Sequence, residues 1–509
     1  MGVQLNESLK RSAGERIYAC SFTRAAATEL AGRNNMIPES NIGTIHSLCY
    51  RRYEGKKTII EVDKELLDEW NKRYGHTWPV MYRSSTPEEE EEQWSGDRTG
   101  LTTWNVERAR MSGRKNPLDF VKAWEEFKEK NNAIDFTDML LNAPDDLECD
   151  VLLVDEAQDL TPLQFKIVRQ WGGKARDMFC LAGDDDQCIY EWMGASPADM
   201  LSELPPERKR YLKRSFRLPR KIHAYADKWI KKLGPRREPK DFEPRDEEGD
   251  VESRAYSLQE PENLINEVKQ VTAAGKTVMV LASCAYMLAP MIEAMRKQGL
   301  AFHNPYRRIR TDWNPLQAGK TGRKILAFDE LQKTYHSDDV AGAAKAIEST
   351  ELWQKWVGMV QAKDIFVRGG KKFLTEWGPD TIPYHKVVKC FEQYAIQEMF
   401  REGLPWLEKN LTGTTAKKTA YPFKILKEHG IDALRAVPKI IVGTIHSVKG
   451  GEADVVILAP DLSFAAARQI DESPRAGKDG LIRQFYVGMT RARETLVRIQ
   501  PSSKHFVDL

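Results

Sequence analysis

The sequence predicts an α/β protein with two domains, each built around a parallel β-sheet and each interrupted by a mainly helical insertion. Short apolar runs that end in small or acidic residues recur towards both ends of the chain. Most of these runs are followed by a segment of helical character, and this alternation is typical of βαβ units. A chain of 509 residues is also long enough for several compact units of ~150 residues.

Seven runs are predicted as strands, and their order along the chain separates the two domains. The runs are IYACSFT, NIGTIHS, CDVLLVDEAQD and MFCLAGDDDQ in the first domain, then TVMVLAS, KIIVGTIHS and DVVILAPD in the second. Helices are expected at 24–33 and 162–171.

Two stretches of different composition interrupt the α/β pattern. Residues 54–130 are rich in Trp, Glu and Lys, and residues 312–428 are Lys-rich and helical in pattern. The acidic run 88–92 is expected to be a solvated loop. We therefore assign the chain as follows: first domain, 1–53 and 131–214; first insertion, 54–130; second domain, 215–311 and 429–509; second insertion, 312–428.

Composition limits the classes of function. Lys and Arg number 77 against 75 Asp and Glu, with a net charge of +2, so a polyanion must be bound by locally clustered basic residues. The seven cysteines are scattered, with no C-x-x-C pair and no clustering with His, which argues against a zinc or iron–sulfur site. The longest mostly apolar stretch, 278–290, falls short of the ~20 residues that span a bilayer. We expect a soluble, cytoplasmic protein.

The segment VLLVDEAQDL at 151–160 indicates a nucleotide site. It reads as an apolar strand that ends in Asp155 and Glu156, and a carboxylate pair at the carboxyl edge of a parallel sheet suits a nucleoside triphosphate and its metal. Asp155 would hold Mg²⁺, and Glu156 would orient or deprotonate the attacking water. A surface turn is the other interpretation of this pair, although the following Gln and Asp favour a site.

A second strand with an acidic turn lies in MFCLAGDDDQCIYEWMGASP. Gln187, beside the carboxylates, could sense the terminal phosphate, and Tyr190 and Trp192 could be exposed rings that stack on bases, each worth ~1–3 kcal/mol. The alternative is that both rings belong to the core.

Several segments together resemble the motifs of the superfamily 1 helicases of the UvrD/Rep/PcrA type. VDEAQD, GDDDQCIYEW, LKRSFRLP, TIHSVKGGEADVVIL and FYVGMTRAR resemble motifs II to VI, in the right order. SFTRAAATEL and GTIHSLCYRRY resemble motifs Ia and Ib, and IDFTDML resembles a short family segment before motif II. The resemblance implies two RecA-like domains of the P-loop NTPase fold, with ATP between them and single-stranded DNA across both.

The five residues GTIHS occur twice, at 43–47 and at 443–447. The resemblance assigns one copy to each RecA-like domain, as a strand-to-loop turn whose hydroxyl and backbone N–H groups approach a phosphate and whose His contacts phosphate or base. Thr44 and His46, with Ser47, would grip nucleic acid in the first domain. Thr444, His446 and Lys449 would do so in the second.

Further roles follow from the resemblance, position by position. Arg217 and Arg491 match the family arginines that reach the γ-phosphate from the second domain. Phe216 matches an aromatic that stacks on adenine, Glu452 a carboxylate near the ribose, and Phe22 a base-stacking ring of motif Ia.

The family's phosphate cradle, G-x-x-x-x-G-K-[ST], does not occur in these 509 residues. Its expected place precedes a helix at about 6–12, so it would fall before Met1. Two GKT triplets, at 275–277 and 319–321, have Gln270 and Asn314 where the first Gly is needed, and neither is expected to replace it. We therefore expect slow ATP hydrolysis by this chain, because the cradle supplies much of the electrostatic stabilisation.

The sequence thus predicts an ATP-dependent DNA helicase that uses ATP and Mg²⁺, acts on single-stranded DNA and duplex junctions and, by resemblance, moves 3′ to 5′. The alternative is a non-hydrolysing DNA-binding or partner-binding protein derived from a helicase. A helicase–nuclease subunit is disfavoured because no nuclease constellation follows FYVGMTRAR.

Overall fold

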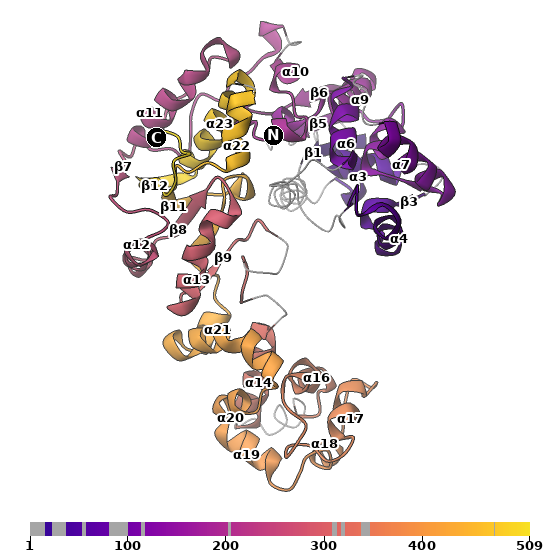
Figure 1. The fold of residues 1–509 in the computed structure, drawn as a ribbon, viewed down its shortest axis with the longest axis vertical. Coiled ribbons are helices and arrows are strands. Elements are labelled where there is room, and N and C mark those ends of the chain that lie inside the picture. Colours follow the sequence, from indigo (N-terminus) through magenta and orange to yellow (C-terminus); the bar gives the residue numbers. More distant parts are fainter. Residues whose placement is uncertain are drawn as a thin grey trace.

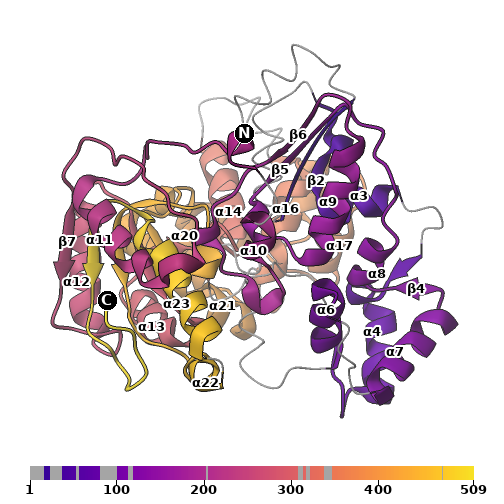
Figure 2. The same ribbon diagram turned by 90° about the horizontal axis from the view of Figure 1, so that it is seen from above.

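Two parallel sheets form the centres of two halves of the molecule (Figures 1 and 2). The computed structural model describes residues 16–22, 37–52, 57–80, 100–112, 118–201, 205–307, 313–316, 321–336, 347–472 and 474–509. The helices expected at 6–12 and 24–33, the acidic run 88–92 and most of the triplet 319–321 lie outside these residues. The predicted fold class, two α/β units with parallel sheets, is confirmed.

The first sheet has four parallel strands in the order β2-β1-β5-β6. The strands are β1 (Ile17–Ser21), β2 (Ile42–Thr44), β5 (Val151–Asp155) and β6 (Met178–Leu181). Alternate side chains of β1 and β5 enter two separate cores, as expected of strands covered on both faces. One core also takes in α3 (Ile45–Arg51), α8 (Phe136–Leu141) and α9 (Pro162–Lys174), and α9 confirms the helix expected at 162–171.

A small helical unit lies between β2 and β5 in the sequence. It contains α4 (Lys64–Tyr74), α6 (Gly100–Arg110) and α7 (Leu118–Lys130), and β3 (Thr58–Ile59) pairs with β4 (Ala133–Ile134) at its base. Trp70, Phe120 and Trp124 are fully buried and pack ring against ring. This unit therefore has a core of its own.

The second sheet has six parallel strands in the order β7-β12-β11-β8-β10-β9. They are β7 (Asp250–Ser253), β8 (Val278–Ala282), β9 (Phe302–His303), β10 (Ile440–Thr444), β11 (Ala453–Leu458) and β12 (Ala492–Arg498). The order β10-β8-β11-β12 repeats the order β2-β1-β5-β6 of the first sheet, with a GTIHS strand first in each.

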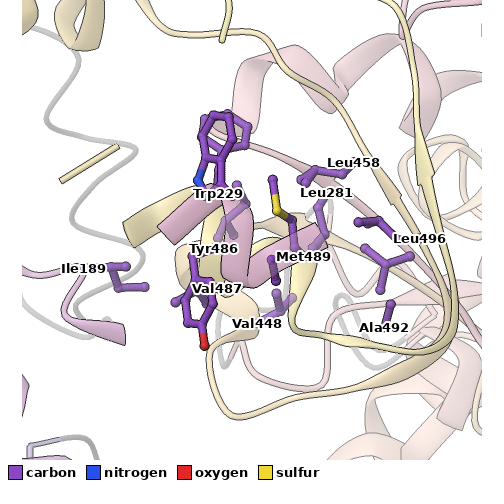
Figure 3. Close-up of a cluster of buried hydrophobic side chains, with 14 of the residues drawn as sticks. Ile189, Trp229, Leu281, Val448, Leu458, Tyr486, Val487, Met489, Ala492 and Leu496 are labelled. Atoms are coloured by element: carbon purple, nitrogen blue, oxygen red, sulfur yellow. The ribbon is translucent and has the colours of Figure 1, made fainter. Parts of the chain in front are cut away.

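Alternation along the second sheet divides its side chains between two faces. Val278 and Val280 pack with α12 (Pro261–Ala273) and α13 (Ala289–Lys297). Met279 and Leu281 pack with α11 (Arg220–Ile230) and α23 (Pro474–Met489) on the other face (Figure 3).

The core on this second face extends across to the segment that follows β6. Cys188, Ile189 and Tyr190 belong to the same buried cluster as Trp229, Leu281, Tyr486 and Val487, and Figure 3 shows Ile189 reaching it from a separate segment. The two halves are therefore joined by apolar packing as well as by polar contacts.

A second helical unit lies between β9 and β10 and extends to one end of the longest axis (Figure 1). Its helices are α14 (Thr321–Tyr335), α16 (Thr350–Trp356), α17 (Gly370–Glu376), α18 (Tyr384–Val388), α19 (Ala395–Glu402), α20 (Leu404–Lys409) and α21 (Gly413–His429). They enclose a separate hydrophobic core. None of the described helices combines the length and the apolar character that crossing a membrane requires.

Replacing Trp356 should destabilise this second helical unit strongly. Its side chain is fully buried and its ring lies 4.8 Å from that of Phe328, so Trp356→Ala should cost about 3–5 kcal/mol of unfolding free energy. Urea unfolding measures this loss. The control Lys372→Ala removes a side chain that is 76% exposed and should change the free energy by less than about 0.5 kcal/mol. Equal effects of the two changes would contradict the described core.

Candidate functional site

The carboxyl ends of the first sheet bring Asp155, predicted for a nucleotide site, close to Thr44, predicted to contact nucleic acid, and to Ser21, which was not among the predicted site residues. Ser21 ends β1 and pairs in register with Asp155 at the end of β5 and with Thr44 at the end of β2. Within the described residues, the buried hydroxyl of Ser21 has no hydrogen-bond partner. A carboxylate and a neighbouring hydroxyl are ligand types that Mg²⁺ accepts together with water and substrate phosphates.

Glu156 follows Asp155 in a left-handed backbone conformation, with φ 54° and ψ 40°. Such a conformation is costly for a residue other than glycine and is retained where the surroundings enforce it. The amide of Gln158 donates to Glu156 Oε2 at 2.5 Å, and the backbone N–H of Asp184 donates to Gln158 Oε1 at 3.0 Å. Gln158, which was not among the predicted site residues, therefore fixes the carboxylate of Glu156 relative to the acidic turn after β6.

Lys449 reaches Glu156 from the second half of the molecule. Its ammonium lies 3.3 Å from Glu156 Oε2, forms an ion pair with Asp159 and donates to the backbone carbonyl of Gln187 at 2.9 Å. The sequence predicts that Lys449 contacts nucleic acid. In this conformation it is instead buried against the carboxylates, because they are the nearest counter-charges for a lysine that the apolar contact between the halves encloses.

The electrostatics of this pair keep both groups charged. Burial raises the pKa of Glu156, but Lys449, Gln158 and Arg491 outweigh burial and hold it below its ordinary value. Burial lowers the pKa of Lys449, but Asp159 and Glu156 outweigh burial and raise it. Glu156 is therefore ionised at neutral pH.

Gln187 lies between a carboxylate of its own turn and an arginine of the other half. Its amide donates to Asp184 Oδ2 at 2.7 Å, and Arg491 Nη2 donates to its Oε1 at 3.5 Å. Arg491 is almost fully buried and also donates to the carbonyls of Val487 and Gly451. Burial and then the nearby Arg217 lower the pKa of Arg491.

Arg217 is held at the surface beside the exposed ring of Phe216. Its Nε donates to Glu452 Oε2 at 2.8 Å, and Arg493 donates to the other oxygen of Glu452 at 3.1 Å. Phe216 is 86% exposed, so its face is open to a flat, apolar ligand. Arg217 and Glu452, both predicted to contact the nucleotide from the second half, are thus in direct contact, and Phe216 precedes Arg217 in the chain.

The two GTIHS segments have the same hydrogen-bonded geometry. In each, the backbone N–H of the Ser donates to the Thr hydroxyl at 3.2 Å, and the Ser hydroxyl donates back to the Thr carbonyl, at 2.8 Å in the first copy and 2.9 Å in the second. A Cβ at Gly43 or Gly443 would lie 2.2 or 2.6 Å from that Ser hydroxyl. The Gly, Thr and Ser of both copies are therefore explained by one turn.

The two histidines of these segments differ in their surroundings. The His46 ring lies 6.0 Å from that of Phe136 and is partly exposed. His446 is buried, its Nδ1 accepts from Gln484 at 3.2 Å, and its Nε2 then donates to the carbonyl of Ile189 at 3.0 Å. In this conformation His446 spans the two halves and presents no free nitrogen to a base.

Tyr190 is fully buried, contrary to the predicted exposed ring. Its ring packs 5.2 Å from that of Phe22 and 5.9 Å from that of His446. The physical reason is the shared core, which encloses the segment after β6. Trp192 is only partly buried, and its ring centroid lies 6.5 Å from that of His446, so Trp192 and Phe22 are the partly exposed rings of this group.

The acidic turn at Asp184, Asp185 and Asp186 has the ligand atoms for a cation, but Lys240 supplies the positive charge. The three carboxylates offer oxygens within 4.8 Å of one another. The ammonium of Lys240 pairs with all three, at 2.8 Å from both Asp184 and Asp186, and Arg237 adds two hydrogen bonds to Asp186. These carboxylates are therefore not candidates for the Mg²⁺ site.

The GKT triplet at 275–277 does not form a phosphate cradle. The N–H and hydroxyl of Thr277 both bond to Asp454 at 2.8 Å, and Lys276 pairs with Glu494 at 2.7 Å. Thr277 immediately precedes β8, so the triplet lies at the amino edge of the sheet, opposite the edge that carries Thr444.

Comparison with known proteins identifies the family to which the chain belongs. Residues 7–205 match the UvrD/REP helicase N-terminal domain, and residues 420–502 match the UvrD-like helicase C-terminal domain. The chain belongs to the UvrD/Rep helicase family.

Curated relatives agree with this assignment. A putative ATP-dependent DNA helicase of Bacillus subtilis is 24% identical over 75% of the chain and 57% of its own length. A probable DNA helicase II homolog of Mycoplasma pneumoniae is 26% identical over 43% of the chain and 36% of its own length. The ATP-dependent DNA helicase PcrA of Staphylococcus epidermidis is 25% identical over 42% of the chain and 33% of its own length. The UvrD/Rep-family chain thus spans between a third and somewhat over half of these relatives.

Two glycine changes in this UvrD/Rep-family chain should affect stability differently, because only one of them lies in a GTIHS turn. Gly443→Ala places a Cβ 2.4 Å from Asn304 Nδ2, so overpacking should lower the unfolding free energy by about 1–3 kcal/mol. The control Gly173→Ala lies in α9 with nothing within 4 Å and should be neutral or stabilising by up to ~1 kcal/mol. Chemical denaturation of both variants tests the difference, and a tolerated Gly443→Ala would contradict the described turn.

Lys240→Met should destabilise the protein in a pH-dependent way. Burial lowers the pKa of Lys240, but the three aspartates raise it above its ordinary value, so titration of Lys240 itself removes its contribution only above about pH 10.4, as pH rises through the raised pKa. Burial raises the pKa values of Asp184 and Asp185, and Lys240 opposes this effect, so without Lys240 stability should fall as pH rises above about 3.9.

The deficit of Lys240→Met should therefore grow between about pH 4 and pH 7 and reach about 3 kcal/mol at neutral pH. Unfolding free energies at both pH values measure it, with Lys372→Met as the exposed control. A deficit that is the same at both pH values would contradict the role of Lys240 as counter-ion.

Proposed function

We propose that this chain is the motor part of an ATP-dependent DNA helicase that moves 3′ to 5′ on single-stranded DNA. The observation that supports this most is that Glu156 and Gln187 of the first half meet Lys449 and Arg491 of the second half within hydrogen-bond distance. A hydrolytic carboxylate, a glutamine and an arginine brought together from two sheets suit phosphoryl transfer.

Each predicted residue has a place in this proposal. Asp155, with the Ser21 hydroxyl beside it, would hold Mg²⁺, which would neutralise charge on the phosphates. Phe216 would stack on the base and Glu452 would lie near the ribose, since both are exposed beside Arg217. Arg217 and Arg491 would stabilise developing negative charge, and Glu156 would hold the proton taken from the attacking water.

Nucleic acid would lie along the carboxyl edges of both sheets. The residues proposed for this contact are Phe22, Thr44, His46 and Trp192, whereas Tyr190, Thr444, His446 and Lys449 are buried and would contribute only if their surroundings change. Stacking and phosphate contacts of this kind do not depend strongly on base sequence. Duplex junctions are the expected substrate.

The proposal predicts ATP hydrolysis that single-stranded DNA stimulates and that Glu156→Gln reduces by at least about 100-fold. The matched control Glu376→Gln changes a glutamate that is 65% exposed in the second helical unit and should leave the rate unchanged. Release of phosphate with and without DNA measures both. DNA binding without hydrolysis in the unchanged chain would overturn the proposal and favour the non-hydrolysing alternative.

A further inference from the structure

Lys449 is unusual because a buried lysine from one half of the molecule contacts the proposed hydrolytic carboxylate of the other. Its side chain is 8% exposed, whereas that of Glu156 is 35% exposed. A buried ammonium is tolerated only with charged partners in good geometry. Here the partners are Glu156, Asp159 and the carbonyl of Gln187.

The two oxygens of Glu156 are not equivalent. Gln158 and Lys449 both bind Oε2, at 2.5 and 3.3 Å. Among the described residues, no hydrogen bond or ion pair falls on Oε1. One oxygen is therefore anchored from both halves of the molecule, and the other is left to accept a proton or a hydrogen bond from water.

We propose that Lys449 is a positioning residue that holds Glu156 for hydrolysis and is supplied only when the two halves are in contact. This inference rests on the proposed function. Because Lys449 anchors Oε2 and ties it to the Gln187 carbonyl, it fixes the open oxygen relative to Gln187 and Arg491. A misplaced base loses much of its effect even when its ionisation is unchanged.

Lys449 lies on the same loop as the second GTIHS segment, so its contact with Glu156 can couple nucleic-acid binding to hydrolysis. Lys449 follows Ser447 by two residues, and the turn between them is held by the Thr444 hydroxyl and by the bond from His446 to the Ile189 carbonyl. Any shift of this loop towards nucleic acid therefore also moves the anchor of Glu156. Binding of nucleic acid at the second GTIHS segment and the placement of Glu156 for hydrolysis are therefore linked through Lys449.

The test compares Lys449→Met and Lys449→Arg with the unchanged chain at saturating ATP and single-stranded DNA. Lys449→Met should lower kcat about 100-fold and change the KM for ATP by less than about threefold. Lys449→Arg, which keeps the charge, should recover most of the rate. In the Glu156→Gln background, Lys449→Met should cause no further loss, because it acts through Glu156.

Lys128→Met is the matched control. Lys128 is another buried lysine with three carboxylate partners, Glu125, Asp135 and Asp138, but it lies in the first helical unit. Lys128→Met should lower the melting temperature about as much as Lys449→Met does, and should leave kcat within about twofold of that of the unchanged chain. Loss of rate in both variants would indicate general destabilisation and overturn the proposal.

A second readout does not depend on turnover. The decreases in melting temperature caused by Lys449→Met and Glu156→Gln should not add in the double variant if the two side chains interact. Additive decreases, an unchanged kcat in Lys449→Met, or a loss confined to DNA affinity would each overturn the role of Lys449. An unchanged chain with no ATP hydrolysis would overturn the proposed function, and the melting cycle would then decide the Lys449 contact alone.

Discussion

The pairing of charges buried between the two halves is the constraint on which the site depends. Lys449 meets Glu156 and Asp159, and Lys240 meets the aspartates after β6. Removing any partner leaves an uncompensated charge in a region that the apolar cluster around Ile189 shields from water. The relative placement of the halves and the geometry of the groups proposed for hydrolysis are therefore set by the same contacts.

The equivalent strand order of the two sheets explains why one pentapeptide occurs twice. Each GTIHS strand pairs with a neighbouring strand, β1 or β8, in a parallel sheet, and each ends in a Thr–Ser turn with one geometry. The surroundings then diverge, since one His is partly exposed and the other is enclosed by the opposite half. The local turn is a property of the five residues, and what it can bind is a property of the tertiary structure.

This difference also separates what could be predicted from sequence from what could not. Strand ends, the carboxylates of β5 and the parallel sheets follow from local patterns of apolar and acidic residues. The burial of Tyr190 and the position of Lys449 depend on contacts between segments more than 250 residues apart. Lys240 gave no signal, because a lone lysine in a polar stretch is typical of a solvent-exposed position. Gln158 counted in favour of a site as part of DEAQD, but its bonds to Glu156 and to the turn after β6 depend on tertiary structure.

The second helical unit is attached to the second sheet through two helices. It is entered and left through α14 and α21, and α21 is fixed to the turn before β9 by bonds from Tyr421 and His429 to the carbonyls of Leu300 and Gly299. Among the residues that the structure describes, its core shares none with the sheets. A change confined to this unit can thus alter the surface that the unit presents while the packing of the two sheets stays as it is.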